Sequence, residues 1–205
     1  MGTGRLEAFS DGVFAIAITL LILTVDLSHA GSGRLAERLL QLWPSYVAYG
    51  VSFLTIGIMW ANHHDLFRQI GRTDRTLVLL NLMLLMLVAF IPFPTRVVAE
   101  FARSGDERRA AALLYGITLT TTAIFFLALW LYASYRGRLL HADADPRAVS
   151  GITRSYLPGS PTYGLATLLA LVSPISSLVM FGAIAVFYAL SSSLFGRAGD
   201  QRTTV

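Results

Sequence analysis

The chain of 205 residues contains no cysteine and no lysine, and charged residues make up only 14% of it. Without cysteine, neither a disulfide framework nor a thiolate metal site can form. A soluble globular domain carries about 25% charged residues, so the low charge argues against a soluble protein. The sequence also lacks a glycine-rich phosphate loop, a Ser-His-Asp order and a carboxylate pair. We therefore expect no enzyme and no cofactor.

The chain is rich in apolar residues. They form 55% of the chain, and several long apolar runs raise its mean hydropathy to +0.62. Such runs are typical of membrane-spanning helices. All 16 basic residues are arginine, and they lie in short segments between the runs. Basic residues in such connecting segments set the orientation of membrane helices. The pI near 9.8 therefore predicts a protein of the lipid bilayer and not a nucleic-acid partner.

The runs predict an all-α polytopic membrane protein with one six-helix domain over residues 1–205. The expected helices cover residues 6–27, 45–67, 76–96, 110–135, 152–172 and 175–194. A short interfacial helix is expected at 34–42, and Pro92 and Pro94 should end or kink the third helix. The last third allows two interpretations. One is a single kinked helix over 163–190. The other, which the Ser-Pro turn signal favours, is two helices separated at Ser173-Pro174, the first of them broken around Pro158 and Pro161.

Six helices place both termini on one side of the membrane. On that topology 10 of the arginines lie on the side of the termini and 6 lie on the other side. Because arginine is enriched in cytoplasmic loops, we expect both termini in the cytoplasm and the protein in the plasma membrane.

The segment from Arg5 to Asp26 is an apolar helix with a charge at each end. At about 100° per residue, Ile16, Leu20 and Leu23 share one face and Thr19 lies at its flank. A plain core or lipid-facing helix has the same spacing, and a mid-helix threonine can bond back to its own helix. The residues alone leave these interpretations open.

Polar residues at the start of this segment, Ser10 and Asp11, point more than about 100° away from that face. A carboxylate beside a membrane helix is costly unless it is paired. Arg5, His63 and His64 are the expected partners of Asp11, in a tertiary clamp or in a proton relay. A metal site is not expected, because the two histidines are adjacent and no cysteine is present. Asn81 is expected to form an interhelical hydrogen bond.

The run from Arg5 to Asp11 fits the pattern R-x-x-x-F-S-D and leads directly into the first apolar helix. This pattern resembles the signature of the transmembrane protein 175 family, the lysosomal potassium channels and their bacterial relatives. The resemblance extends along the chain to Trp60-x-x-His63-His64, to Asn81 with its leucine run, and to Phe90-Ile91-Pro92-Phe93-Pro94-Thr95. One six-helix unit is present, as in bacterial members, whereas the animal proteins carry two.

The resemblance implies a homotetramer in which the first helix of each subunit lines a central pore. Rings of Ile16, Leu20 and Leu23 would constrict the pore, and Thr19 would support selectivity. No filter of the TVGYG kind is present. A cytoplasmic anchoring network would consist of Arg5, Phe9, Ser10, Asp11, His63 and His64.

Asp26 is a separate expectation from the residues. Four copies near the extracellular mouth would form an acidic ring that concentrates cations. A helix-end carboxylate that merely faces solvent is the alternative.

The expected function is that of a potassium-selective, weakly discriminating cation leak channel. Conduction would be passive, and the aliphatic rings would act as a hydrophobic gate. Potassium and other monovalent cations would be the permeant species, and further copies of the chain would be its protein partner. Two alternatives are a proton-coupled secondary transporter that uses Asp11 and a histidine, and a membrane scaffold that transports nothing.

Overall fold

The computed structural model describes residues 2–27, 34–105 and 107–196, with side chains as far as residue 189. The regular secondary structure of the described residues is helical, apart from one isolated β-bridge between Ile70 and Leu140. Its elements are α1 (Thr3–Leu20), η1 (Leu21–Thr24), α2 (Leu35–Gln41), α3 (Trp43–Phe67), α4 (Arg75–Phe90), α5 (Pro92–Phe101), α6 (Glu107–Ser134), η3 (Tyr135–Gly137), α7 (Pro146–Tyr156), α8 (Gly159–Leu169) and α9 (Pro174–Gly196).

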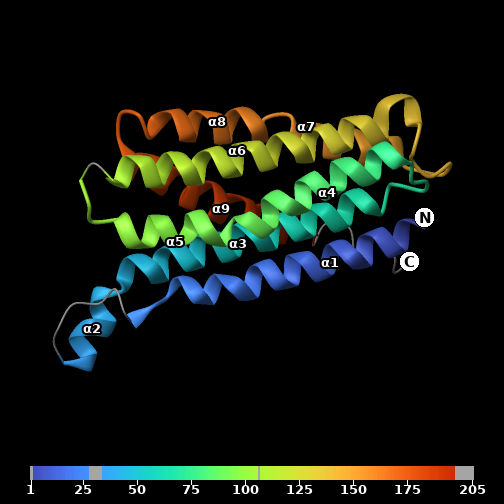
Figure 1. Ribbon diagram of the computed structural model, residues 1–205. Coiled ribbons are helices and arrows are strands. Elements are labelled where there is room, and N and C mark those ends of the chain that lie inside the picture. Colours follow the sequence, from blue (N-terminus) through green and yellow to red (C-terminus); the bar gives the residue numbers. More distant parts are fainter. Residues whose placement is uncertain (1, 28–33, 106, 197–205) are drawn as a thin grey trace.

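The long helices lie side by side in an elongated bundle (Figure 1). Helix α1 runs along its outer edge and packs on α3 and α4, while α6 and α8 form the opposite side. The N-terminus, the α3–α4 turn and the α6–α7 connection lie at one end of the bundle. Helix α2 and the α5–α6 connection lie at the other end, which we call the α2 end. One flank of α1 therefore has no neighbour within the described chain.

The first helix begins earlier and ends differently than predicted. The α-helix starts at Thr3 and not at Leu6, and it tightens into a 3-10 helix after Leu20. With rises of about 1.5 Å and about 2.0 Å per residue, the two parts together span about 35 Å. The hydrocarbon core is about 30 Å thick. The helix is therefore long enough to span a membrane, which the uncharged stretch alone was not.

Proline determines where two further helices begin. Trp43-Pro44 opens α3 at its first turn, where proline loses no hydrogen bond, and α3 is bent by 47° from the short helix α2. Pro92 divides the predicted third helix into α4 and α5, because it has no N–H to continue the helix. The predicted kink is confirmed, and α5 continues to Phe101, five residues beyond the expected end.

The last third contains separate helices. Ser173 and Pro174 separate α8 from α9, so the two-helix interpretation is correct and the single helix over 163–190 is wrong. The break expected around Pro158 and Pro161 is confirmed near Pro158, where it divides α7 from α8, but α7 begins earlier than predicted, at Pro146. Asp145 begins α7 as its N-cap, accepting a hydrogen bond from the N–H of Arg147 at 2.8 Å.

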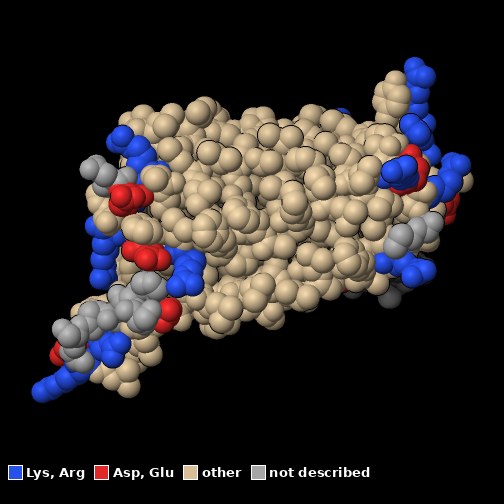
Figure 2. Space-filling view, viewed as in Figure 1, with Lys and Arg blue, Asp and Glu red and all other residues tan. Residues whose placement is uncertain are grey.

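Charged side chains gather at the two ends of the bundle and leave a broad uncharged band between them on the visible face (Figure 2). Within the described residues, three spans are long and apolar enough to cross a membrane: Thr3–Thr24, Arg75–Phe101 and Glu107–Gly137. Counted as one span, the bent pair α2 and α3 makes a fourth. These features are those of a multi-pass membrane protein.

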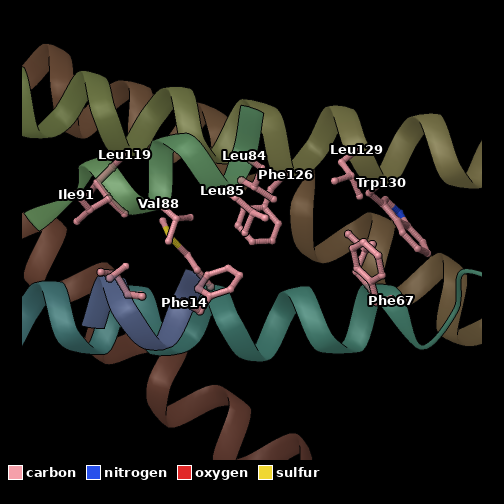
Figure 3. Close-up of a cluster of buried hydrophobic side chains, with 14 of the residues drawn as sticks. Phe14, Phe67, Leu84, Leu85, Val88, Ile91, Leu119, Phe126, Leu129 and Trp130 are labelled. Atoms are coloured by element: carbon pink, nitrogen blue, oxygen red, sulfur yellow. The ribbon is translucent and has the colours of Figure 1, made fainter. Parts of the chain in front are cut away.

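Buried side chains of α1, α3, α4 and α6 form the core, part of which is shown in Figure 3. Phe14 is the main contribution of α1 and is only 1% exposed. Trp130 of α6 is fully buried, and its indole N–H donates to Thr153 Oγ1 of α7 at 2.8 Å. Lipid tails are as apolar as these side chains, so close packing contributes most of their stabilisation.

At the end that holds the N-terminus, the α3–α4 turn pairs with the α6–α7 connection. The N–H groups of Gly71 and Arg72 donate to the carbonyl of Leu139 at 2.9 and 3.1 Å. Asp74 is the N-cap of α4 and accepts from Tyr132 Oη at 2.6 Å. This hydrogen bond is the main reason that the pKa of the Asp74 carboxyl is lowered, with smaller effects from the Leu77 N–H and from Arg138. These contacts fasten α4 to α6.

Candidate ion pathway and its anchoring network

The two faces of α1 differ sharply in burial. Its buried positions recur at spacings of three and four residues: Leu6, Ser10, Phe14, Ala17, and Leu21 and Thr24 of η1. On the other face Ile16 is 61% exposed, Leu20 is 41% exposed and Leu23 is 64% exposed. The three predicted constriction residues thus share one exposed apolar face. Nothing else in the described chain covers it.

The 3-10 segment changes how these side chains are aligned. In a 3-10 helix, side chains at i and i+3 eclipse. Leu23 therefore lies nearly in line with Leu20, instead of drifting round as it would in an α-helix. Burial agrees with this geometry, because Leu21 and Thr24 form an equivalent pair on the buried face.

Thr19 lies on the exposed face. Its hydroxyl donates to the carbonyl of Ile16 at 2.8 Å, which is the bond to its own helix that was one of the two interpretations of this residue. This bond uses the single hydroxyl proton, so both lone pairs of Oγ1 remain available to coordinate a cation.

Asp26 does not lie on the helix that was used to place it. The 3-10 segment ends at Thr24, and Val25 is extended with φ −95° and ψ 91°. The predicted direction of Asp26 therefore does not apply, since it assumed a helix to residue 27. Next to it, the guanidinium of Arg38 on α2 donates to the Leu27 carbonyl at 2.9 Å. Helix α2 is thereby tied to the end of the first helix.

A buried chain of hydrogen bonds joins α1 to α4 and α3. His63 Nε2 lies 2.9 Å from Asn81 Oδ1, and Asn81 Nδ2 donates to Ser10 Oγ at 3.0 Å. Ser10 then donates to the Leu6 carbonyl at 2.8 Å. Ser10, His63 and Asn81 are all fully buried. The expected interhelical role of Asn81 is confirmed.

The chain of bonds fixes the state of the His63 ring. Asn81 uses its amide N–H toward Ser10, so its oxygen faces His63 and the imidazole must donate from Nε2. His63 Nδ1 is buried and makes no hydrogen bond with the described residues. The ring stacks on Phe67 with centroids 4.4 Å apart, and Phe14 lies 5.4 Å away. A neutral imidazole suits this apolar surrounding, because a second N–H would lack an acceptor.

Two further contacts connect α1 with α3. The indole N–H of Trp60 donates to Asp11 Oδ1 at 2.9 Å, and His64 Nδ1 lies 2.8 Å from Glu7 Oε1. The partner predicted for Asp11 was therefore wrong: it is an indole and not an arginine or a histidine. The reason is that the antiparallel helices bring residue 11 opposite residue 60 and residue 7 opposite residue 64.

The other two residues of the signature point outward. Arg5 is exposed, and its guanidinium makes no hydrogen bond or ion pair with the described residues. Phe9 is 52% exposed. The structure thus brings together Ser10 and His63 through Asn81 and leaves Arg5 and Phe9 on the surface of this one chain. Among the described residues, no group of three histidine, aspartate or glutamate side chains could hold a metal ion.

Glu7 and Trp60 take part in these contacts but were not among the predicted site residues. A spacing in the sequence could have found them. Glu7, Ser10 and Asp11 are spaced i, i+3 and i+4, and Trp60, His63 and His64 repeat that spacing. Residues with this spacing share one helix face. Two matching triplets on adjacent antiparallel helices meet side to side.

Comparison with known proteins identifies the family. The family model for the endosomal/lysosomal potassium channel TMEM175 matches residues 5–92. A potassium channel of Streptomyces collinus is 45% identical over 187 residues, covering 91% of each chain. The chain belongs to the TMEM175 family.

Other members extend the similarity to nearly the whole fold. A potassium channel of Chamaesiphon minutus is 43% identical over 194 residues, which is 93% of this chain and 95% of that one. The crystal structure of a lysosomal potassium-selective channel TMEM175 homolog from that organism superimposes with a TM-score of 0.83 at 39% identity, covering 93% of this chain and 97% of the other. The human endosomal/lysosomal proton channel TMEM175 is 34% identical over 146 residues, which is 67% of this chain but only 28% of the human protein.

Proposed function

We propose that this TMEM175-family protein is a potassium-selective, weakly discriminating cation channel. Cations pass down their gradient through a central pore that α1 and η1 line in a homotetramer. The observation that carries the proposal is the uncovered face of α1, which holds Ile16, Leu20 and Leu23 at 41–64% exposure. The names of the bacterial relatives, which are called potassium channels, support the permeant ion.

A single chain cannot enclose a pore with one helix. Four copies related by a four-fold axis bring four α1 helices together and close the ring. The outer-edge position of α1 (Figure 1) suits this arrangement. It also leaves α3 and α4 behind α1 as a rigid support.

In the proposed pore, Ile16, Leu20 and Leu23 form successive aliphatic rings. A narrow ring of aliphatic side chains expels water and so stops ions until it widens or becomes wet. The nearly linear stacking of Leu20 and Leu23 makes the outer two rings a continuous apolar collar. Passive conduction through such a collar is slow, as expected of a leak channel.

Thr19 and Asp26 are the polar groups proposed for ion selection and attraction. Oγ1 of Thr19 has its proton on Ile16 and turns its lone pairs outward, so four copies offer oxygen ligands to a partly dehydrated cation. Asp26 follows the end of η1 and would supply an acidic ring at the extracellular mouth.

The network of Arg5, Phe9, Ser10, Asp11, His63 and His64 is proposed to hold α1 in register behind the pore. Ser10 and His63 do so through the buried Asn81, while Asp11 does so through Trp60. Arg5 and Phe9, exposed in the single chain, are assigned to contacts between subunits. This part of the signature would set the position of the pore helix without touching the ion.

The proposed topology has six spans, with α8 and α9 as the last two and both termini in the cytoplasm of a plasma-membrane protein. Support comes from the arginines, of which 10 belong to the side of the termini and 6 to the other. Figure 2 shows basic side chains at both ends of the bundle, with an uncharged band between them.

The two alternative functions lack such support. A proton-coupled transporter that uses Asp11 and a histidine would need the two to exchange a proton, but Asp11 accepts from an indole and His63 meets an amide, while His64 pairs with Glu7 instead. A scaffold would leave the apolar face of α1 to lipid, but it would not account for relatives that are named potassium channels.

Purified protein in liposomes with an outward potassium gradient tests the proposal. We expect potassium efflux that requires no proton gradient and persists when the inside and outside pH are clamped equal. Folded protein that carries no potassium would refute the channel, and flux that requires a proton gradient would favour the transporter.

A further inference from the structure

A cavity of about 420 Å³ lies between α3, α5, α6 and α9, at the α2 end of the bundle. It is separate from the proposed pore, since no residue of α1 borders it. Its walls are almost entirely apolar and include Val47 and Val51 of α3, Val98 of α5, and Leu178 and Val179 of α9. Cavities of this size are typical of sites for small molecules and lipid chains.

The polar groups at the inner end of the cavity need no hydrogen bond from an occupant. Ser52 and Tyr115 border it, and their hydroxyls lie 3.0 Å from one another. Ser52 also bonds Thr95 at 2.8 Å. The polar groups at this end are therefore already satisfied, and an apolar chain can rest against them without loss.

Two arginines border the same cavity. Arg103 donates to the carbonyl of Gln41 at 3.0 Å, and Arg108 donates to the carbonyl of Ala102. A guanidinium has five N–H donors, so most of those on each side chain remain available. Two like charges beside one apolar space are stabilised by an anion between them.

The depth of the cavity limits what can bind there. Arg103 and Arg108 lie within and just after the α5–α6 connection, which is at the α2 end of the bundle (Figure 1), while Val47 and Val51 follow one and two turns into α3. Trp43 also borders the cavity and is 56% exposed, the position of an interfacial tryptophan. An occupant at this depth must be apolar at one end and anionic at the other.

We propose that this cavity binds an anionic phospholipid of the surrounding leaflet. One acyl chain fills the space between α3 and α9, and Arg103 and Arg108 hold the phosphate. The charge of the mouth and the apolar walls match such a lipid at both ends. A zwitterionic lipid would bring a cation of its own toward the two guanidiniums and bind more weakly.

Quenching of Trp43 fluorescence by lipids with brominated acyl chains tests the proposal. The protein is reconstituted in vesicles that mix brominated phosphatidylglycerol with unlabelled phosphatidylcholine, and in vesicles with the label exchanged. Subtracting the signal of a Trp43→Phe variant isolates Trp43 from the other two tryptophans. We expect phosphatidylglycerol to be preferred by about fivefold for each arginine.

The double variant Arg103→Gln/Arg108→Gln should lose this preference, whereas the matched control Arg109→Gln should keep it. Arg109 is adjacent in sequence and exposed but does not border the cavity. Equal quenching by both lipids in the wild type would overturn the proposal. Loss of the preference in the Arg109→Gln control would overturn it too, because the effect would then be general charge at the membrane surface.

A second variant, with both arginines intact, tests whether an acyl chain enters the cavity. Gly182 borders the cavity, and a Cβ there would meet only Val51 Cγ2, at an ordinary distance of 3.6 Å. Gly182→Leu therefore fills space without forcing the backbone apart. We expect it to lower Trp43 quenching by phosphatidylglycerol, in protein that elutes as the wild type does. Unchanged quenching would show that no chain enters, as when a second copy of this protein covers the cavity.

Discussion

Asn81 is the hub of the buried hydrogen-bond chain, and Asn81→Leu should destabilise the protein by about 1–3 kcal/mol. The substitution preserves the approximate volume but removes the acceptor of the His63 Nε2–H. A buried donor without an acceptor costs about 1–3 kcal/mol. Ser10 loses less, because its own hydroxyl still donates to the Leu6 carbonyl. Interhelical hydrogen bonds in membranes average about 0.6 kcal/mol, which favours the lower half of the range.

A double-mutant cycle separates the hydrogen bond from general repacking. His63→Phe removes the N–H that Asn81 Oδ1 accepts from, so each single variant leaves one buried polar group without its hydrogen-bond partner. In the double variant neither partner is stranded. We expect its loss of stability to be smaller than the sum of the two single losses by about 1 kcal/mol.

Reversible unfolding in mixed micelles, titrated with a denaturing detergent at fixed protein concentration, measures these free energies. Asn62→Leu is the matched control. It makes the same change on α3, where the Asn62 side chain forms no hydrogen bond with the described residues and its backbone carbonyl still accepts from Tyr156. A coupling energy near zero, or an Asn81→Leu variant as stable as the control, would refute the assignment of the buried chain.

Four other predictions concern the pore and the packing of the bundle. Leu23→Ser should raise potassium flux into liposomes by on the order of tenfold, because it replaces an apolar ring with a polar one. Transfer of a leucine side chain from water to an apolar environment is favourable by about 1.5–3 kcal/mol, and a barrier lowered by about 1.4 kcal/mol raises a rate tenfold. Thr19→Val should lower the potassium-to-sodium permeability ratio in bilayer recordings, since the oxygen ligands are lost while the shape is kept. Gly116→Ala should cost about 1–3 kcal/mol in detergent unfolding, because a Cβ there would lie 2.6 Å from Thr167 Oγ1. Asp74→Asn should cost about 1 kcal/mol at neutral pH. The lowered pKa of Asp74 means that this difference is full above the ordinary carboxyl pKa and is lost as the pH falls through the lowered value.

Each of these substitutions has a matched control elsewhere in the chain: Leu165→Ser, Thr162→Val, Gly50→Ala and Asp143→Asn. Leu165 is 62% exposed on α8, and Thr162 bonds its own helix at 2.7 Å, as Thr19 does. Gly50 has open space around its Cβ position, and Asp143 is exposed. Flux or selectivity that changes equally in test and control variants would remove the roles of Leu23 and Thr19. If Gly116→Ala were as stable as Gly50→Ala, the close packing assigned to Gly116 would be refuted. If the stability difference between Asp74→Asn and the wild type did not change with pH, the role assigned to the Asp74 carboxylate would be refuted.

Much of the fold followed from local patterns in the sequence. Apolar runs located the helices, and Trp43-Pro44, Pro92 and Ser173-Pro174 marked where they begin or break, because proline removes a backbone donor wherever it stands. Helix limits were less accurate. The break between α7 and α8 was expected from Pro158, but the tightening of the first helix after Leu20 depends on packing with neighbours, which local propensity does not report.

The site divides in the same way. The face shared by Ile16, Leu20 and Leu23 was predictable, since helical periodicity alone fixes it. The partner of Asp11 was not, because several donors lay at compatible depths and only the antiparallel register of α1 and α3 selects Trp60. The direction of Asp26 was not predictable for a related reason, since the extended backbone at Val25 ends the helical geometry on which it was based.

By itself, the sequence determined a helical membrane protein, its arginine-rich ends and the apolar face of its first helix. These follow from composition and period, which each segment carries locally. Tertiary structure alone decided which side chains meet across helices: Asn81 with Ser10 and His63, Trp60 with Asp11, and the two arginines with the apolar cavity. Such pairings depend on the register and rotation of helices far apart in the chain, and the packing of the whole bundle sets both.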